Sequence, residues 1–298
     1  MHCIVPGARK SPERHYIRIA PEVQALFPPW TEPTGFLGQI TAHARRRAVA
    51  LAPTRATLEM SAAAAPGAAS FELALRGECV AVIAEVKRRS PSKGDIRPEI
   101  DAAAQAIAYA EGGARAVSVL TEPDHFGGSL DDLARARAAV IVPLLRKDFL
   151  VSRLQLLEAR ASGASAVLLI ARALQPSELT ELVREARALD LTPLVEIRSE
   201  GELDAALRAG ATVIGVNNRD LETLVITEGH AEQLIPLVPA HCLAIAESGI
   251  RSAADVERAA AAGADAVLVG SLVSAASDPA RALRPLTAVP RRGRDRHG

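Results

Sequence analysis

Lysine is rare in this chain and is concentrated in one short stretch. Of 298 residues, 35 are lysine or arginine but only four are lysine, and two of these, Lys87 and Lys93, lie in AEVKRRSPSKGD at 84–95. Arginine can replace lysine as a surface cation, but it does not lose its proton under ordinary conditions. The placement therefore indicates that an amine is required here, either as a general acid or as a Schiff-base nucleophile.

Glu85 lies two residues before Lys87, at the end of an apolar segment. Residues i and i+2 of a strand face the same side, so we expect both side chains to point into one site. Burial lowers a lysine pKa and raises a glutamate pKa, whereas their mutual attraction opposes both shifts. Such a pair is suited to proton transfer, and a plain ion pair is the alternative. Lys147 and Glu196 follow similar apolar segments further along the chain.

Two pairs of small residues also follow apolar segments, Ser248-Gly249 directly after Glu247 and Gly270-Ser271 near the end of the chain. Small residues allow backbone N–H groups to approach an anion closely. Each pair alone is a weak signal, because tight turns use the same residues. The two pairs together predict a phosphate site.

The elements that must hold these residues follow a four-fold rhythm. One phrase, in which a glycine ends an Ala-rich helix and an apolar strand follows, recurs at 112–120, 162–170, 209–216 and 262–270. Another apolar strand precedes each phrase, at 80–87, 142–149, 191–197 and 242–248. Strands without apolar–polar alternation are typical of a parallel sheet buried on both faces. Ser177 and Asp278 are predicted N-caps of two of the intervening helices.

Eight β/α units within 80–288 predict a single α/β domain, a (β/α)8 TIM barrel, with a doubly wound open sheet as the alternative. A TIM barrel places its chemistry at the C-terminal ends of its strands, which is where the candidate residues fall. The helical pattern at 35–52 predicts an N-terminal extra helix, so the barrel with this helix spans 35–288. We expect residues 1–34 to be irregular and poorly ordered, and residues 289–298 to form a solvated basic tail.

Composition limits the classes of function. The formal net charge is zero and the pI is about 7.1, which argues against a nucleic-acid-binding protein but allows one phosphorylated small-molecule substrate. Cys3, Cys79 and Cys242 lie far apart and the histidines are scattered, so neither a disulfide framework nor a metal site is predicted. The sequence has no signal peptide or bilayer-length apolar run, and we expect a cytoplasmic protein without membrane partners. One barrel supplies every strand end, so a monomer is sufficient.

At the residues discussed above, the chain resembles the indole-3-glycerol-phosphate synthase family of tryptophan biosynthesis. AEVKRRSPSKG is the most specific stretch, and the similarity continues in order through TEPDHFGGS (121–129), LLRKDF (144–149), LVEI (194–197), GVNNRDL (215–221), AESGI (246–250) and VLVGS (267–271). It covers about 35–288. The resemblance implies a carboxy-lyase that converts 1-(2-carboxyphenylamino)-1-deoxyribulose 5-phosphate to indole-3-glycerol phosphate, releasing CO2 and water without a cofactor.

The resemblance also implies roles for individual residues. Lys147 would be the general acid that protonates the ketone oxygen, and Lys87 would hold the substrate carboxylate and could supply the proton for dehydration. Glu196 would be a base or would stabilise a cationic intermediate, and Glu85 would act near the leaving hydroxyl. Asn217 would orient Glu196 or the substrate hydroxyls. The residues expected to bind the aromatic ring, the phosphate and nearby groups are Phe126, Ser90, Arg219, Glu247, Ser248, Gly249, Gly270 and Ser271.

Three alternatives stay open. Another phosphosugar barrel, such as phosphoribosylanthranilate isomerase, needs an acid/base pair, but that family does not carry the AEVKRRSPSKG stretch. A Schiff-base aldolase would use Lys147 or Lys87 as its nucleophile. A barrel that only binds a phosphorylated ligand or a partner is expected to have lost some of the acids and bases at its strand ends, and here all of them are present.

Overall fold

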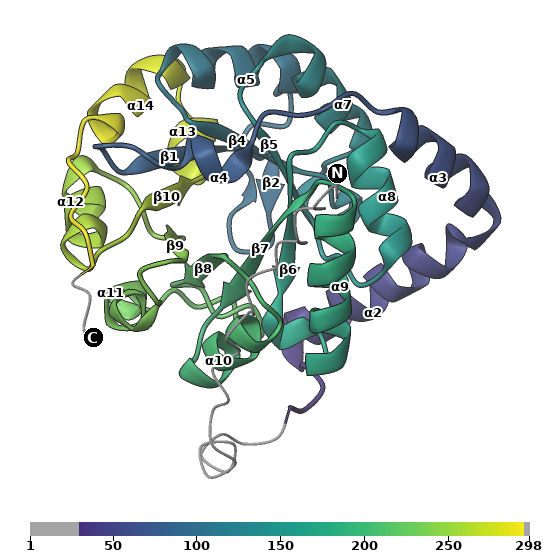
Figure 1. Ribbon diagram of the computed structural model, residues 1–298. Coiled ribbons are helices and arrows are strands. Elements are labelled where there is room, and N and C mark those ends of the chain that lie inside the picture. The colour runs from purple at the N-terminus through teal and green to yellow at the C-terminus, as the bar shows by residue number, and fades with distance from the viewer. Residues whose placement is uncertain (1–29, 295–298) are drawn as a thin grey trace, which may run out of the picture.

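Short apolar segments form a closed circle of eight parallel strands in the computed structural model, which describes residues 30–294 (Figure 1). Around the barrel the order is β1-β10-β9-β8-β7-β6-β5-β4. The strands are β1 (Ala81–Val86), β4 (Ala116–Leu120), β5 (Leu144–Lys147), β6 (Ala166–Ile170), β7 (Thr192–Ile197), β8 (Val213–Asn217), β9 (Leu243–Glu247) and β10 (Ala266–Val269). Because β1 pairs with both β4 and β10, the barrel prediction is confirmed and the open sheet is excluded.

Alternation along each strand separates two apolar layers. Val82 and Ala84 of β1 face the surrounding helices, whereas Ala81 and Ile83 belong to the cluster inside the barrel. The same alternation places Glu85 on the inner side, one step above Ile83. Every strand that ends in a candidate residue repeats this arrangement, so the barrel interior is apolar in its lower part and polar at its C-terminal mouth.

Helices follow the strands and form the outer ring (Figure 1). They are α5 (Ala102–Glu111), α7 (Leu130–Ala139), α8 (Arg153–Ala161), α9 (Pro176–Ala188), α10 (Glu200–Arg208), α11 (His230–Leu234), α12 (Ala253–Ala261) and α14 (Pro279–Thr287). The repeated glycines end their helices with positive φ, as predicted: Gly113, Gly163, Gly210 and Gly263 have φ of 92°, 83°, 83° and 92°. This left-handed conformation carries no steric penalty for glycine.

The two predicted N-caps have different outcomes. Asp278 caps α14 by accepting a hydrogen bond from the Arg281 N–H at 2.9 Å. The prediction for Ser177 was wrong, because α9 already begins at Pro176. Its N-cap is Gln175, whose N–H donates to the Glu178 carboxylate at 2.9 Å.

Short elements interrupt the eight-fold pattern at both ends of the barrel. At the mouth, β2 (Arg89–Ser90) and β3 (Gly94–Asp95) form a hairpin, and α6 (Pro123–Phe126) and α13 (Ser271–Ser274) follow β4 and β10. The 3-10 turns are η1 (Ala52–Thr54), η2 (Ala171–Ala173) and η3 (Ile235–Leu237). Within residues 30–294, no helix is long and apolar enough to cross a membrane.

The N-terminal extension contacts both ends of the barrel. The predicted extra helix is confirmed as α2 (Gly35–Ala50), whose Leu37 and Ile40 belong to the interior cluster. Two helices were not predicted: α3 (Arg55–Ala64), which packs beside α8, and α4 (Phe71–Ala74) at the opposite end (Figure 1). Of the segment expected to be poorly ordered, 1–29 lies outside the described residues. Residues 30–34 are described and form neither helix nor strand.

The basic tail is attached where the structure describes it, in contrast to the expected solvated end. The Val80 N–H donates to the Val289 carbonyl at 2.9 Å, beside β1. Arg291 and Arg294 both pair with the buried Asp265 carboxylate, at 2.9 Å for Arg294, and Asp265 also accepts the Ala244 N–H. These contacts hold the lower end of the barrel together, and residues 295–298 lie outside the described part of the chain.

Asp265→Ala should lower the free energy of unfolding by about 3 kcal/mol, because it leaves buried arginine charge without its partner. Urea denaturation measures the change. Glu257→Ala, on the exposed face of α12, serves as the control and should stay within about 0.5 kcal/mol of the parent. Equal stability of the two variants would show that the tail contacts contribute nothing.

Candidate active site

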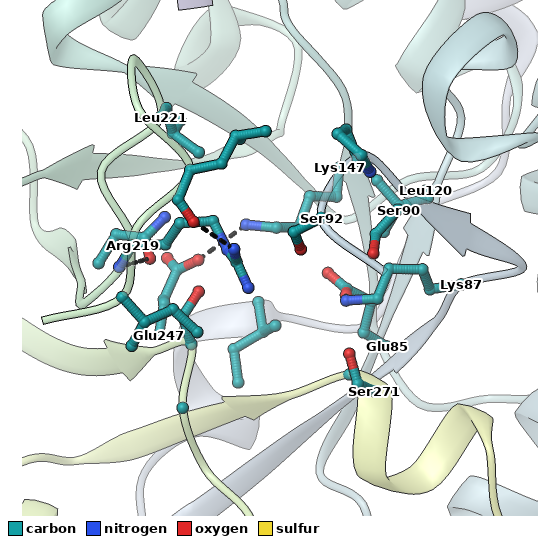
Figure 2. A pocket seen from close by; sticks show the side chains of 18 of the residues that line it. Glu85, Lys87, Ser90, Ser92, Leu120, Lys147, Arg219, Leu221, Glu247 and Ser271 are labelled. Atoms are coloured by element: carbon teal, nitrogen blue, oxygen red, sulfur yellow. Dashed lines mark hydrogen bonds and ion pairs between the residues drawn. The ribbon is translucent and has the colours of Figure 1, made fainter. Parts of the chain in front are cut away.

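The polar strand ends surround a cavity of about 550 Å³. Figure 2 shows Glu85 and Lys87 on one side of it and Glu247 and Arg219 on the other. The structure brings every predicted site residue to the wall of this cavity: Glu85, Lys87, Ser90, Phe126, Lys147, Glu196, Asn217, Arg219, Glu247, Ser248, Gly249, Gly270 and Ser271.

Glu85 and Lys87 form a close ion pair at the end of β1. Lys87 Nζ lies 2.6 Å from Glu85 Oε1, and their side chains are 14% and 3% exposed. The hydroxyls of Tyr109 and Ser274 lie 2.9 and 2.7 Å from the Glu85 carbonyl oxygen, to which each can donate. Burial raises the pKa of Tyr109, so this hydroxyl stays protonated and can remain a donor. The backbone that carries the pair is therefore held in place.

Lys147, at the end of β5, lies between two carboxylates, Glu196 of β7 and Glu247 of β9. Its Nζ is 2.7 Å from Glu247 Oε2 and 3.4 Å from Glu196 Oε2. Burial alone would lower the pKa of Lys147, but the attraction of Glu247, Glu196 and Glu85 outweighs burial and raises it above the ordinary value. The amine is thus firmly protonated.

Glu247, unlike Lys147, is not held in one protonation state. Burial raises its pKa to about 7, against the opposing attraction of Lys147. Its second oxygen, Oε1, is buried without a hydrogen-bond partner among the described residues. Glu247 can therefore change its protonation near neutral pH.

Asn217 holds the carboxylate of Glu196, the remaining catalytic candidate, in place. Its Nδ2 donates to Glu196 Oε1 at 2.9 Å, while its Oδ1 accepts the Arg219 N–H at 2.9 Å. The Arg219 guanidinium donates to the Leu224 carbonyl, and burial lowers the pKa of Arg219. The end of β8 and the turn that follows it thus fix the Glu196 carboxylate and present a cation to the cavity.

The two predicted phosphate loops lie side by side, after β9 and β10. Ser248 and Gly249 have φ of 64° and 84°, and a serine in this left-handed region is strained. Asn218, which the sequence analysis missed, stabilises this turn: its Nδ2 donates to the Ser248 carbonyl and its Oδ1 accepts the Ala231 N–H. In the second loop, after β10, Ser271 is the first residue of the short helix α13.

Two glycines leave space for the charged side chains. A Cβ on Gly270 would lie 2.4 Å from Glu85 Oε1 and 2.7 Å from Lys87 Nζ. A Cβ on Gly215 would lie 2.1 Å from Glu247 Oε1. Gly270 was predicted only as a phosphate residue, and the structure adds a steric reason for glycine at this position.

The sequence analysis also missed most of the cavity's apolar wall. Phe126 was predicted, and its ring centroid lies 6.2 Å from that of Phe149. The other large apolar residues of the wall include Phe36, Leu168, Ile170, Leu221 and Ile226. Phe149 could have been found, because it follows Lys147 by two residues and so continues the inward-facing positions.

The basic residues of the opening stretch separate in the structure. Lys87, Ser90 and Lys93 line the cavity. Arg88 turns away and binds the Asp132 carboxylate through both terminal nitrogens, at 2.6 and 2.7 Å. The cavity therefore combines amines, carboxylates and an apolar wall, which suits acid/base chemistry on an anionic aromatic substrate.

One group in residues 30–294 has a spacing that could hold a metal ion: His43, Glu122 and Asp124, outside the cavity. The Glu122 carboxylate already accepts backbone N–H groups of residues 124–126 as the N-cap of α6. Its oxygens are thus used structurally, and this group gives no evidence for a metal.

The family model and the curated relatives agree on one family. The family model described as indole-3-glycerol phosphate synthase matches residues 37–286. The indole-3-glycerol phosphate synthase of Mycobacteroides abscessus is 50% identical over 231 residues, 78% of this chain and 85% of the relative. Indole-3-glycerol phosphate synthase 1 of Streptomyces coelicolor is 48% identical over 241 residues, 81% and 90% of the two chains. A thiamine phosphate pyrophosphorylase structure from Pyrococcus furiosus shares the fold, with a TM-score of 0.53 and 19% identity over 70% of this chain and 93% of that one.

Gly270→Ala should destabilise the protein by about 1–3 kcal/mol, because the added methyl group forces the Glu85–Lys87 pair apart. The matched control is Gly67→Ala, where a Cβ meets nothing within 4 Å and should cost little. Urea denaturation of both variants gives the comparison. A Gly270→Ala protein as stable as Gly67→Ala would contradict the steric role.

Proposed function

The chain belongs to the indole-3-glycerol phosphate synthase family, and from that premise we propose how its cavity residues share the reaction. The enzyme is a carboxy-lyase of tryptophan biosynthesis that converts 1-(2-carboxyphenylamino)-1-deoxyribulose 5-phosphate to indole-3-glycerol phosphate, CO2 and water. The observation that carries the assignment of roles is the pairing of each amine with a carboxylate across one cavity, Lys87 with Glu85 and Lys147 with Glu247 and Glu196.

Ring closure needs an acid at the ketone oxygen. The aromatic carbon that bears the carboxylate attacks the ketone carbon, a C–C bond forms, and the oxygen takes a proton from Lys147. The protonated state of Lys147 supports this role. The positive charge that develops on the aryl amine is stabilised by Glu196, whose carboxylate Asn217 holds in place.

Decarboxylation restores the aromatic ring. Lys87 holds the substrate carboxylate until the bond to CO2 breaks and its electron pair returns to the ring. Because the positively charged amine is the acceptor of these electrons, the step neutralises the charge. The apolar wall around Phe126 and Phe149 supports binding of the ring in this position.

Dehydration requires an acid and a base at different places. The new hydroxyl leaves as water with a proton from Lys87, close to Glu85, and Glu196 removes the proton from the neighbouring carbon to form the indole double bond. Two protons are delivered and one is removed, and the net uptake of one balances the carboxylate charge that leaves as CO2. The 2.6 Å Lys87–Glu85 contact supports the pair as a relay.

The rest of the cavity binds the substrate. Ser248-Gly249 and Gly270-Ser271 hold the phosphate through backbone N–H groups and hydroxyls, in the loops where TIM barrels bind phosphate. Ser90 and Arg219 complete the anion site, and Glu247 lines the cavity beside Lys147.

The aldolase alternative is disfavoured by charge. A Schiff-base lysine must lose its proton before it attacks, whereas the carboxylates around Lys147 raise its pKa. Incubating the protein with the carboxyphenylamino-deoxyribulose phosphate should produce indole fluorescence, and borohydride should trap no covalent adduct. A folded sample that forms no indole product would refute the proposed function.

Lys147→Arg should reduce turnover by at least about a hundredfold, because arginine keeps the charge but is a far weaker proton donor. The measurement is kcat from the rise of indole fluorescence at saturating substrate. Arg46→Lys, the reverse exchange at an exposed position, is the control and should leave kcat unchanged. Near-normal turnover of Lys147→Arg would exclude the proton-donor role.

Glu196→Gln should lower kcat by about a hundredfold and change KM less than about threefold, because the amide keeps the contact to Asn217 but can neither take a proton nor stabilise a cation. Glu200→Gln, at an exposed residue of α10, is the matched control. A rise in KM with unchanged kcat would place Glu196 in binding alone.

A further inference from the structure

We propose that Arg47, on the N-terminal helix α2, is a positioning residue for Lys147 and acts through the neighbouring Asp148. Arg47 lies outside the eight-fold repeat and outside the cavity wall. The inference rests on the proposed role of Lys147 as the acid of ring closure.

The Arg47 guanidinium donates two hydrogen bonds to the Asp148 carboxylate. Its Nη2 lies 2.7 Å from Asp148 Oδ1 and its Nη1 lies 3.3 Å from Oδ2. The Asp148 side chain is fully buried, while that of Arg47 is 24% exposed. A two-nitrogen contact fixes the orientation of a carboxylate as well as its position.

Asp148 connects three elements at this point. It accepts hydrogen bonds from the Thr121 hydroxyl after β4, at 2.9 Å, and from the Phe149 N–H, at 2.8 Å. Arg146 Nη2, on β5, lies 3.2 Å from Asp148 Oδ2. Burial alone would raise the pKa of Asp148, but Arg146 and Arg47 outweigh burial and lower it. Asp148 is therefore an ionised anchor with Lys147 and Phe149 on either side of it in the chain.

The strand end that carries Lys147 needs such an anchor. Pairing of β5 with β6 covers only Leu145 and Arg146, so Lys147 has no ladder partner on that side. On the other side, Lys147 pairs with Leu120, and its carbonyl accepts the Thr121 N–H at 3.1 Å. Beyond that contact, the chain is held by the bonds to Asp148 and by Gln155, which donates to the Phe149 carbonyl and accepts the Val151 N–H. A shift of this segment would move Lys147 away from Glu247 and disturb the Phe149 wall.

The same helix offers a matched control. Arg45 makes an equally two-pronged contact with Glu178, at 2.9 and 3.0 Å, on the outer surface of α9. Both members of this pair are partly exposed, at 43% and 32%, and neither lines the cavity. Losing Arg45 removes an attachment of α2 to the barrel but leaves Asp148 untouched.

The first test compares Arg47→Met, Arg47→Lys and Arg45→Met in the full chain by steady-state kinetics and thermal unfolding. Arg47→Met should lower kcat about tenfold with little change in KM, because misplaced catalytic groups cost rate more than binding. Arg47→Lys should recover part of the loss, since lysine restores the charge but not the two-nitrogen contact. Arg45→Met should lower the melting temperature less than Arg47→Met, because an exposed pair contributes less to stability than a contact to a buried carboxylate, and it should keep kcat within about twofold.

The pH dependence separates positioning from stability. If Lys147 moves away from its carboxylates, its pKa falls, so the alkaline limb of the kcat profile should shift to lower pH in Arg47→Met but not in Arg45→Met. Equal kcat values and superimposable pH profiles for these two variants would overturn the proposal. Absence of indole formation by the parent protein would instead refute the proposed function itself.

A double-variant cycle tests the route through Asp148. Glu122 and Asp124 are the other acids near Arg47, so its effect could in principle pass through them. If Asp148 mediates the effect, Asp148→Asn combined with Arg47→Met should be no slower than Asp148→Asn alone. If the two reductions in kcat multiply instead, the effect of Arg47 does not pass through Asp148. Asp124→Asn combined with Arg47→Met gives the comparison if Asp148→Asn does not fold, and here the two effects should multiply.

Discussion

The attraction between Lys147 and the carboxylates of Glu247 and Glu196 is the constraint on which the rest of the site depends. Charges in a barrel interior are costly to desolvate, and their attraction rarely repays the whole cost as stability. The structure meets this cost by bringing opposite charges together: Lys87 neutralises Glu85 in the same way. Burial leaves Glu247 near a neutral pKa, while its neighbours keep Lys147 charged. The site thus holds groups of different proton affinity within one cavity.

The alternation of the strands makes this arrangement compatible with a stable fold. Inward positions low in the barrel carry mainly Ala, Val, Leu and Ile. On β1, β5, β7 and β9, the next inward position toward the mouth carries a charged residue. Glycine occupies the positions where a side chain would clash with a charged group on the neighbouring strand. Gly215 leaves room for Glu247, and Gly270 leaves room for Glu85 and Lys87. Stability is therefore concentrated below the site, in the interior cluster and in the Asp265 contacts, and chemistry is concentrated above it.

Most of the barrel and of the polar site could be predicted, because their signals are local. Each glycine-to-strand phrase marks a helix end and a strand, and a polar residue directly after an apolar strand marks the mouth. The apolar wall could not be predicted in the same way, since Leu168 and Ile170 have the composition of ordinary core residues. Arg47 looks like one of three surface arginines, and its partner Asp148 lies 101 residues away in sequence. Contacts of that kind depend on how α2 crosses the barrel, which no short pattern specifies.

The pairing of β1 with β10, which closes the barrel, has a consequence for how the chain folds during its synthesis. β1 and β10 are neighbours in the barrel although their paired positions, such as Ala81 and Ala266, are 185 residues apart in sequence. The Val80–Val289 contact adds to the same seam. On the ribosome, one edge of β1 therefore stays without its partner until β10 has been synthesised. Such an edge can pair with other chains. The contacts of Arg291 and Arg294 with Asp265 join this seam only after β10 has been synthesised.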